Sequence, residues 1–389
     1  MSIFVTGIGI VSAIGLSAEK NLRSLRSLTT GIRRSGKHDL MIGEIDLSDQ
    51  ELIEQLQLAT EDYSRTSLLG LLAAREAWAK NKIDKRIRTG IISATSVGGM
   101  DRTERYYFES QTSNRTDSRS LMTHDNGRTT ERIAVELGIS GYIGTISTAC
   151  SSGANAIMHG ARLIEANKLD RVIAGGSEPL ATFDIKGFSS LSIYDDGICK
   201  PFDEKRMGLN LGEGAAFLML ENEHSISISG NQPICSLAGW HNATDAFHQT
   251  ASSPDGKGAA LAMIHALAKA RIPPQAIDYI NAHGTGTGNN DLSESMALKT
   301  VFGKNIPPFS STKGFTGHTL AAAGAIEAVY CVQAIQSQAM PPNLNFTMPM
   351  KETGMQPETE FHSANLEYVL SNSFGFGGNC TCLIFCKAS

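Results

Sequence analysis

The chain has 389 residues, and 34 Lys and Arg residues against 39 Asp and Glu residues give it a formal net charge of −5. This balance excludes a general attraction for nucleic acid or for an anionic membrane surface, so an acidic partner would need a local basic patch. No stretch reaches about 18 uninterrupted apolar residues, and the N-terminus runs directly into a strand pattern. We therefore expect a cytoplasmic protein that binds neither nucleic acid nor membrane.

The cysteines bear on two further features, a disulfide framework and a structural metal site. There are seven of them, an odd number, and no two have CxxC spacing. This pattern is against a disulfide framework and against a structural zinc site. We therefore expect no bound metal.

Buried strands alternate with helices along the chain, which predicts a layered α/β architecture. The polar stretch 221–233 separates a first strand–helix series from a second one that begins at residue 234. We therefore expect two halves, residues 1–229 and 230–389. In the first half, strand patterns cover 3–7, 89–95, 142–146 and 171–177, and helical spacing of apolar residues marks 67–80 and the stretch from 154 onward.

Cys150 stands between the strand pattern at 142–146 and the helical pattern that follows it. A thiol at such a junction meets the positive end of the helix dipole, which favours the nucleophilic thiolate. A free cysteine among small residues is equally typical of an inert, packed side chain. The local pattern alone leaves both interpretations open.

Two histidines further along the chain occupy positions that suit chemistry. His283 follows the apolar run 277–280 and opens a loop rich in Gly and Thr, where strand ends of α/β sheets commonly carry functional groups. His318 lies at or just before the start of an Ala-rich helix that runs from Thr319 to about Ile335. A helix N-terminus disfavours the imidazolium ion, so we expect a neutral ring. Two neutral histidines could donate hydrogen bonds to an oxyanion.

Four segments together resemble the β-ketoacyl-acyl-carrier-protein synthases, the condensing enzymes of fatty acid and polyketide synthesis. The order and spacing of the segments match this family, and the similarity covers essentially the whole chain. It is greatest to the elongating, synthase II-like type with a Cys-His-His triad. The four segments are 147–154 around Cys150, 281–287 around His283, 313–318 ending at His318, and 372–378.

The resemblance implies a thiolase-like fold, in which two βαβαβ halves form α-β-α-β-α layers. Residues 1–229 would carry the nucleophile, and residues 230–389 would carry the two histidines. It also implies an acyltransferase that catalyses decarboxylative Claisen condensation of malonyl carrier protein with an acyl chain on Cys150. His283 and His318 would bind the malonyl thioester carbonyl, and Lys313 would order the histidines, so these four residues form the expected catalytic set.

The same resemblance implies the partners. Acyl carrier protein would deliver both the acyl and the malonyl group on its phosphopantetheine, and no cofactor of the enzyme's own is expected. We also expect a homodimer, or a heterodimer with a related synthase subunit.

Several further residues take supporting roles by the same match. Glu327 lies in the Ala-rich helix and would pair with Lys313, although a place on a solvated helix face is the alternative. Asp291 and Glu294 would support the histidine loop and complement the dipole of the helix that they begin. Phe376 lies among glycines and would gate the thiol, the alternative being a core aromatic beside a tight turn. The expected substrate-binding residues are Val97, Thr285, Thr287 and Phe374, and a second mobile loop matches at Asp245, His248 and Thr250.

The chain also departs from the family pattern. Asn379 and Cys380 stand where Thr-Asn is usual, Met207 replaces an acidic residue, and the loop 288–290 lacks its usual proline. These changes would leave the chemistry in place and would alter loop dynamics and substrate range. The sequence therefore leaves open a primary fatty acid pathway or a specialised polyketide or polyene pathway.

Two alternative functions remain to be weighed. A thiolase-like acyltransferase would need a second cysteine as base, and Cys380 is a candidate. A non-catalytic chain-length partner of a synthase would lack the nucleophile. The retained Cys150, His283 and His318 favour the condensing enzyme over both.

Overall fold

The computed structural model describes residues 2–60, 62–79, 81–112 and 118–388, and within them ten strands form one sheet built from two five-stranded halves. In the first half the spatial order is β5-β4-β6-β7-β1, and in the second it is β10-β9-β13-β14-β8. The strands of the first half are β1 (Phe4–Ser12), β4 (Thr89–Ala94), β5 (Tyr142–Ile146), β6 (Arg171–Glu178) and β7 (Gly214–Glu221). Those of the second are β8 (Cys235–Thr244), β9 (Tyr279–Asn281), β10 (Phe309–Ser310), β13 (Tyr368–Gly375) and β14 (Asn379–Lys387).

The two halves repeat one topology. Counted in chain order within each half, the fifth strand pairs antiparallel with both the first and the fourth strand. The second strand pairs in parallel with both the fourth and the third strand. The halves join where β1 meets β8, with Phe4 opposite Ser236 and Val5 opposite Cys235. The predicted duplicated thiolase-like fold is therefore confirmed. The boundary at residues 229 and 230 falls between helix α8 (Glu223–Ser229) and β8, and it stays a prediction.

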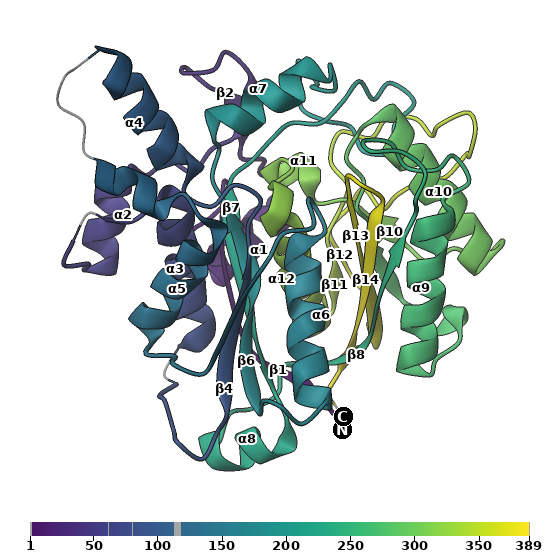
Figure 1. Ribbon diagram of the computed structural model, residues 1–389. Coiled ribbons are helices and arrows are strands. Elements are labelled where there is room, and N and C mark those ends of the chain that lie inside the picture. Colours follow the sequence, from purple (N-terminus) through teal and green to yellow (C-terminus); the bar gives the residue numbers. More distant parts are fainter. Residues whose placement is uncertain (1, 61, 80, 113–117, 389) are drawn as a thin grey trace.

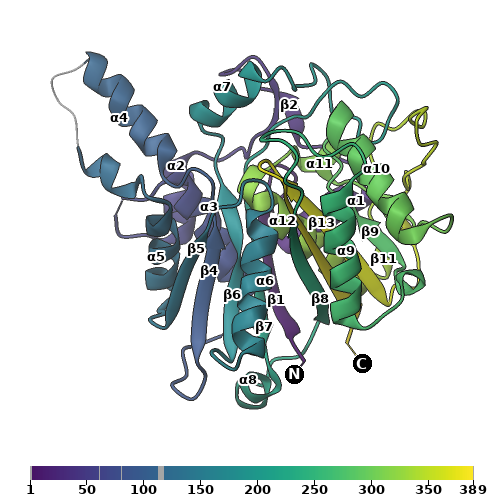
Figure 2. The same cartoon turned by 45° about the vertical axis from the view of Figure 1, so that its right-hand side comes forward.

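Helices separate and cover the two half-sheets in five layers (Figure 1). Figure 2 shows the same arrangement from a second side, with the two middle helices between the half-sheets. From one outer face to the other the helices are α3 (Arg65–Trp78) and α5 (Asn126–Leu137), then α6 (Ser152–Glu165) and α12 (Ala323–Ser337), then α9 (Lys257–Ala270) and α10 (Gly288–Phe302). The helix predicted over 67–80 is α3, and residue 80 lies outside the described residues.

The central helices α6 and α12 approach each other through small residues. A Cβ added to Gly153 would lie 2.8 Å from the backbone nitrogen of Ala325, and one added to Gly324 would lie 2.9 Å from that of Ala154. Real side chains do not make such contacts, so glycine is required at both positions. The close packing brings the turn before α6 beside the segment that precedes α12.

Smaller elements complete the described part of the chain, in which no helix is long and apolar enough to cross a membrane. The helices are α1 (Ala18–Arg26), α2 (Asp49–Leu56), α4 (Met100–Thr112), α7 (Thr182–Ser190) and α11 (Lys313–Thr316). The short 3-10 turns are Ser118–Thr123, Pro274–Ala276 and Leu320–Ala322. The minor strands are β2 (Ile32–Arg34), β3 (Met41–Gly43), β11 (Ala339–Met340) and β12 (His362–Ser363).

Candidate active site

Cys150 projects from a strained turn between β5 and α6. The preceding Ala149 has φ of 51°, a left-handed conformation that is costly for a residue with a Cβ. The Thr148 N–H donates to the Ser152 hydroxyl over 2.7 Å, and that hydroxyl donates back to the Ala149 carbonyl, so the surrounding hydrogen bonds hold the turn. The predicted strand-to-helix junction is present, and the residue at its tip, Cys150, is 5% exposed.

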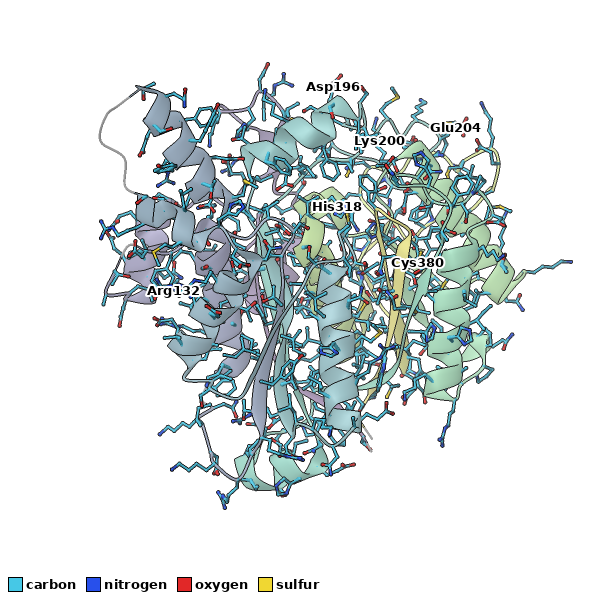
Figure 3. All side chains as sticks on the ribbon, in the orientation of Figure 1. Arg132, Asp196, Lys200, Glu204, His318 and Cys380 are labelled. Carbon is cyan, nitrogen blue, oxygen red and sulfur yellow. The ribbon has the colours of Figure 1, made fainter. Side chains whose placement is uncertain are left out.

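One cavity of about 170 Å³ brings Cys150 together with His283 and His318. The two imidazole rings lie 5.3 Å apart, centroid to centroid, at an angle of 84°. Figure 3 labels His318 and Cys380, which both line this cavity. The other lining residues are Phe188, Ile193, Leu209, Thr250, Ala251, Ser252, Thr285, Thr287, Gly288, Asn289, Asn290, Phe374, Gly375, Phe376 and Gly378.

The Cys150 thiol is held in its protonated form. Burial raises its pKa to about 12, while the charge of Lys313 and the backbone N–H groups of Phe376 and of Cys150 itself act in the opposite direction. The position before a helix N-terminus therefore does not suffice to form a thiolate, in contrast to the expectation from sequence, because desolvation of the charged form is the larger effect. The N–H groups that face the sulfur are those of a candidate oxyanion hole.

Both histidines are neutral, as predicted. Burial is the main cause that lowers the pKa of each well below its usual value, and the positive charge of Lys313 adds to it. The Nζ atom of Lys313 lies 3.3 Å from Nδ1 of His283. Because an ammonium group can only donate, Nδ1 must accept, and the ring proton of neutral His283 is on Nε2. His283 is thereby fixed as a hydrogen-bond donor through Nε2.

Lys313 is held by a buried ion pair with Glu327 of α12. The same ammonium group donates to the backbone carbonyl of His283. Both side chains of the pair are 3% exposed, so the alternative of Glu327 on a solvated face is wrong. Burial raises the pKa of Glu327, and the charge of Lys313 counteracts that shift. The predicted pair therefore links the histidine loop to the central helix.

Asp291 and Glu294 lie behind the histidine loop on α10. The Glu294 carboxylate accepts hydrogen bonds from the backbone N–H groups of His283 and Gly284 over 2.9 and 2.8 Å, and a further one from the Asn372 side-chain amide. Asp291 accepts the backbone N–H groups of Thr285 and Gly286 over 3.0 and 3.2 Å. Neither carboxylate lines the cavity. Their contacts shape the loop that presents His283.

Aromatic rings cover the cavity. The Phe376 ring stacks on Phe188 of α7 with centroids 5.6 Å apart, and Phe374 lies 5.6 Å from the His283 ring. The loop after Phe376 turns through Gly377 and Gly378, whose φ values of 82° and 80° favour glycine. The Gly377 N–H donates a hydrogen bond to the Gln249 carbonyl over 2.7 Å. This bond joins the glycine loop to the loop that contains His248 and Thr250, which is the second mobile loop expected from the sequence.

The remaining substrate-binding predictions separate into two groups. Thr285 and Thr287 line the cavity, with their hydroxyl oxygens 2.9 Å apart. Val97 is buried, and its backbone N–H donates to Glu178 over 3.1 Å, but it is not among the residues that line the cavity. Val97 therefore does not line the cavity that holds the nucleophile, and its role in substrate binding stays a prediction.

Sequence reasoning missed the apolar wall made by Phe188, Ile193 and Leu209. These residues lie in and after α7, outside the four motif segments. Nothing in their local pattern distinguishes them from ordinary packing residues. The stretch 288–290 was noted as a departure from the family pattern, and it also lines the cavity.

Comparison with known proteins agrees with this geometry. Residues 1–225 match the family Beta-ketoacyl synthase, N-terminal domain, and residues 234–347 match its C-terminal domain. The chain is 30% identical over 407 residues to 3-oxoacyl-[acyl-carrier-protein] synthase 2 of Staphylococcus aureus, covering 99% of this chain and 98% of that protein. It is 34% identical over 416 residues to putative polyketide beta-ketoacyl synthase 1 of Streptomyces cyaneus, covering 96% and 95%. Among solved structures, a ketosynthase from Xenorhabdus doucetiae in complex with its chain length factor has 32% identity and a TM-score of 0.87, covering 100% of this chain and 98% of that one.

The chain therefore belongs to the β-ketoacyl synthase family, as the four sequence segments predicted. It is a condensing enzyme of the acyltransferase class, with relatives in both fatty acid and polyketide elongation.

Proposed function

We propose that Cys150 holds the growing acyl chain, and that His283 and His318 activate malonyl carrier protein for condensation. The observation that carries this proposal is the convergence of a buried thiol and two neutral histidines on one cavity. In the first half reaction the sulfur of Cys150 attacks the thioester of an acyl carrier protein. Cys150 loses its proton, the carrier thiol gains one, and the N–H groups of Cys150 and Phe376 stabilise the oxyanion.

In the second half reaction the malonyl thioester carbonyl lies between the two histidines. His283 donates from Nε2, and His318 donates beside it, so the electron pair released with carbon dioxide forms an enolate rather than a free carbanion. The enolate carbon attacks the acyl carbon on Cys150, and the carbon–sulfur bond breaks. The products are a β-ketoacyl carrier protein and the free Cys150 sulfur, which is reprotonated.

The partner in both steps is acyl carrier protein, which appears in the name of the Staphylococcus relative. The phosphopantetheine arrives on that carrier, and the enzyme's own residues suffice for each step. We place the enzyme in the cytoplasm, because Cys150 must stay a free thiol and a reducing compartment preserves it.

We further propose that the enzyme is a dimer with itself or with a related synthase subunit. Strand β5 ends the sheet, and its Tyr142 and Ile143 are each 41% exposed, so its free edge can pair with another chain. The Xenorhabdus ketosynthase in complex with its chain length factor supports a heteromeric partner as the second form. Light scattering of the purified chain alone distinguishes the two: a dimer supports self-association, and a monomer supports the related subunit.

A thiolase-like reaction has one specific observation in its favour, namely that Cys380 lines the same cavity as Cys150. Burial and the nearby charges of Asp245 and Glu294 raise the pKa of Cys380 to about 12, and all of these effects disfavour its thiolate, whereas Lys313 and two backbone N–H groups favour the thiolate at Cys150. The condensing reaction is therefore the better supported function.

The test is to incubate the protein with carrier proteins that bear acyl chains of different length and to measure the mass of the Cys150 peptide. We expect an acyl adduct on Cys150, and β-ketoacyl carrier protein after addition of malonyl carrier protein. The distribution of adduct masses also reports chain preference. Cleavage of a β-ketoacyl thioester by free thiol, without any condensation product, would favour the thiolase-like alternative.

A further inference from the structure

Three asparagines form a hydrogen-bonded cluster directly beneath the nucleophile turn. The Oδ1 atom of Asn379 accepts the Asn155 amide over 2.8 Å and the Asn242 amide over 2.7 Å. The same oxygen lies 2.7 Å from the hydroxyl of Ser151, the residue after Cys150. Asn155 comes from α6, Asn242 from β8 and Asn379 from the start of β14. The cluster therefore joins both halves of the fold at one point.

A second set of contacts fixes how the three amides are oriented. The Asn155 oxygen accepts the Thr381 hydroxyl over 2.8 Å and the Asn242 amide over 3.1 Å. The Asn155 nitrogen donates to the Thr148 hydroxyl over 2.8 Å. Rotating any one amide by half a turn would set donors against donors or acceptors against acceptors. The cluster therefore has one arrangement, and it contacts the nucleophile turn at both Thr148 and Ser151.

The cluster also lies at the base of the two loops beside the cavity. Asn379 directly follows the glycine loop 375–378, and it pairs with Thr244, which directly precedes the loop at Asp245. A Cβ added to Gly375 would lie 2.7 Å from the Thr148 carbonyl oxygen and 3.2 Å from the backbone nitrogen of Cys150. The glycine loop therefore rests on the nucleophile turn, and a movement of the loop would disturb the turn unless something anchors it.

We propose that Asn379, through Ser151 and Asn155, is the positioning residue that keeps the Cys150 turn fixed while the glycine loop moves. This role rests on the proposed function of Cys150 as acyl acceptor. Asn379 acts through the turn and not on the substrate. Loop opening then pivots at Gly377 and Gly378, and the sulfur keeps its alignment with the N–H groups that face it.

The test compares three variants by two measurements. Asn379→Leu removes the central acceptor, and every donor keeps a second acceptor, so the fold should persist. Asn379→Asp keeps the acceptor and adds a negative charge. Thr381→Val is the matched control, because it removes a buried hydroxyl from the cluster and leaves Asn379 in contact with Ser151 and Asn155. The measurements are the rate of Cys150 alkylation by iodoacetamide as a function of pH, located by peptide mass, and the rate of acyl transfer from acyl carrier protein.

We expect Asn379→Leu to slow acyl transfer on the order of tenfold or more with little change in KM, since a small misplacement of a nucleophile is costly. Asn379→Asp should recover most of the maximal alkylation rate, with its pH profile moved upward because the added charge disfavours the thiolate. Thr381→Val should stay within about twofold of the wild type in acyl transfer, even if its melting temperature falls.

Equal losses of acyl transfer in Asn379→Leu and Thr381→Val would overturn the proposal and reduce the cluster to a stability element. The same holds if Asn379→Leu leaves both rates unchanged. The alkylation rate needs no carrier protein, so it tests Asn379 even if the wild type fails to accept an acyl chain. A wild-type protein that does not accept an acyl chain would count against the proposed function of Cys150 and would leave the alkylation result on Asn379 as it stands.

Discussion

Replacing His283 by alanine should separate the two half reactions. His283 supplies a Nε2–H donor whose orientation is set by Lys313 at Nδ1, 3.3 Å away, and by Glu294, which accepts the His283 backbone N–H. Removing one preorganised oxyanion donor from a buried site typically slows a reaction by about 10²–10³-fold. We therefore expect malonyl decarboxylation and condensation to fall by that factor in His283→Ala. Acylation of Cys150 should fall much less, because the groups proposed to stabilise its oxyanion are the backbone N–H groups of Cys150 and Phe376, which the variant retains.

The assay measures release of carbon dioxide from malonyl carrier protein and, separately, the mass adduct on Cys150. His248→Ala is the matched control, because His248 lies in the neighbouring loop and is not among the residues that line the cavity. Its decarboxylation rate should stay close to that of the wild type. Unchanged decarboxylation in both His283→Ala and His318→Ala would refute the reasoning, because the enolate would then be stabilised elsewhere.

Three further predictions follow from the same site. Cys150→Ala should abolish acyl transfer and condensation, and an acyl adduct on another cysteine with intact turnover would contradict the assignment. Glu327→Gln should lower the free energy of unfolding, measured by urea titration, by about 3–5 kcal/mol, because it leaves the buried charge of Lys313 without its counter-ion. The double variant Lys313→Met with Glu327→Leu, which replaces the pair by apolar side chains, should recover most of that loss. In the folded state the pKa values of His283 and His318 lie below their usual value, so below about pH 6.5 these histidines bind protons only in the unfolded chain. The free energy of unfolding should therefore fall on acidification by up to about 1.4 kcal/mol per pH unit for each histidine. Urea titrations between about pH 5 and 7 should show this dependence of the free energy of unfolding on pH in the wild type. The contribution of the two histidines should be missing when both are replaced by glutamine.

Much of the site could be predicted from sequence because its signals are local. Cys150 and His318 each lie just before a helical pattern, and His283 lies where a strand pattern gives way to a loop; such junctions can be read from the chain. The pair of Lys313 and Glu327 was expected from the family resemblance, and the cost of an unpaired carboxylate in an Ala-rich helix agrees with it. The alternation of strands and helices likewise predicted the layers.

What the sequence could not predict depends on tertiary packing. The helix N-terminus beside Cys150 is a local feature and favours the thiolate, whereas the burial that raises the thiol pKa depends on how distant segments pack around the sulfur. The apolar wall at Phe188 and Ile193 has no motif, since any apolar residue could fill it. Val97 was placed in the pocket by family resemblance alone; it is buried but is not among the residues that line the cavity, and its role in substrate binding stays a prediction.

One buried cation acts on the pKa of all three residues of the triad, in addition to the larger effect of burial. The charge of Lys313 lowers the pKa of the Cys150 thiol, and it also lowers those of His283 and His318. These effects act in the direction that the chemistry requires, since a thiolate must form at the cysteine and no imidazolium should form at the histidines. A buried ion pair contributes little to stability when compared with apolar residues of the same volume. The reason to keep Lys313 and Glu327 is therefore electrostatic: Glu327 is the counter-ion of the ammonium group in a dry site, and the charge of Lys313 acts on all three reacting groups at once.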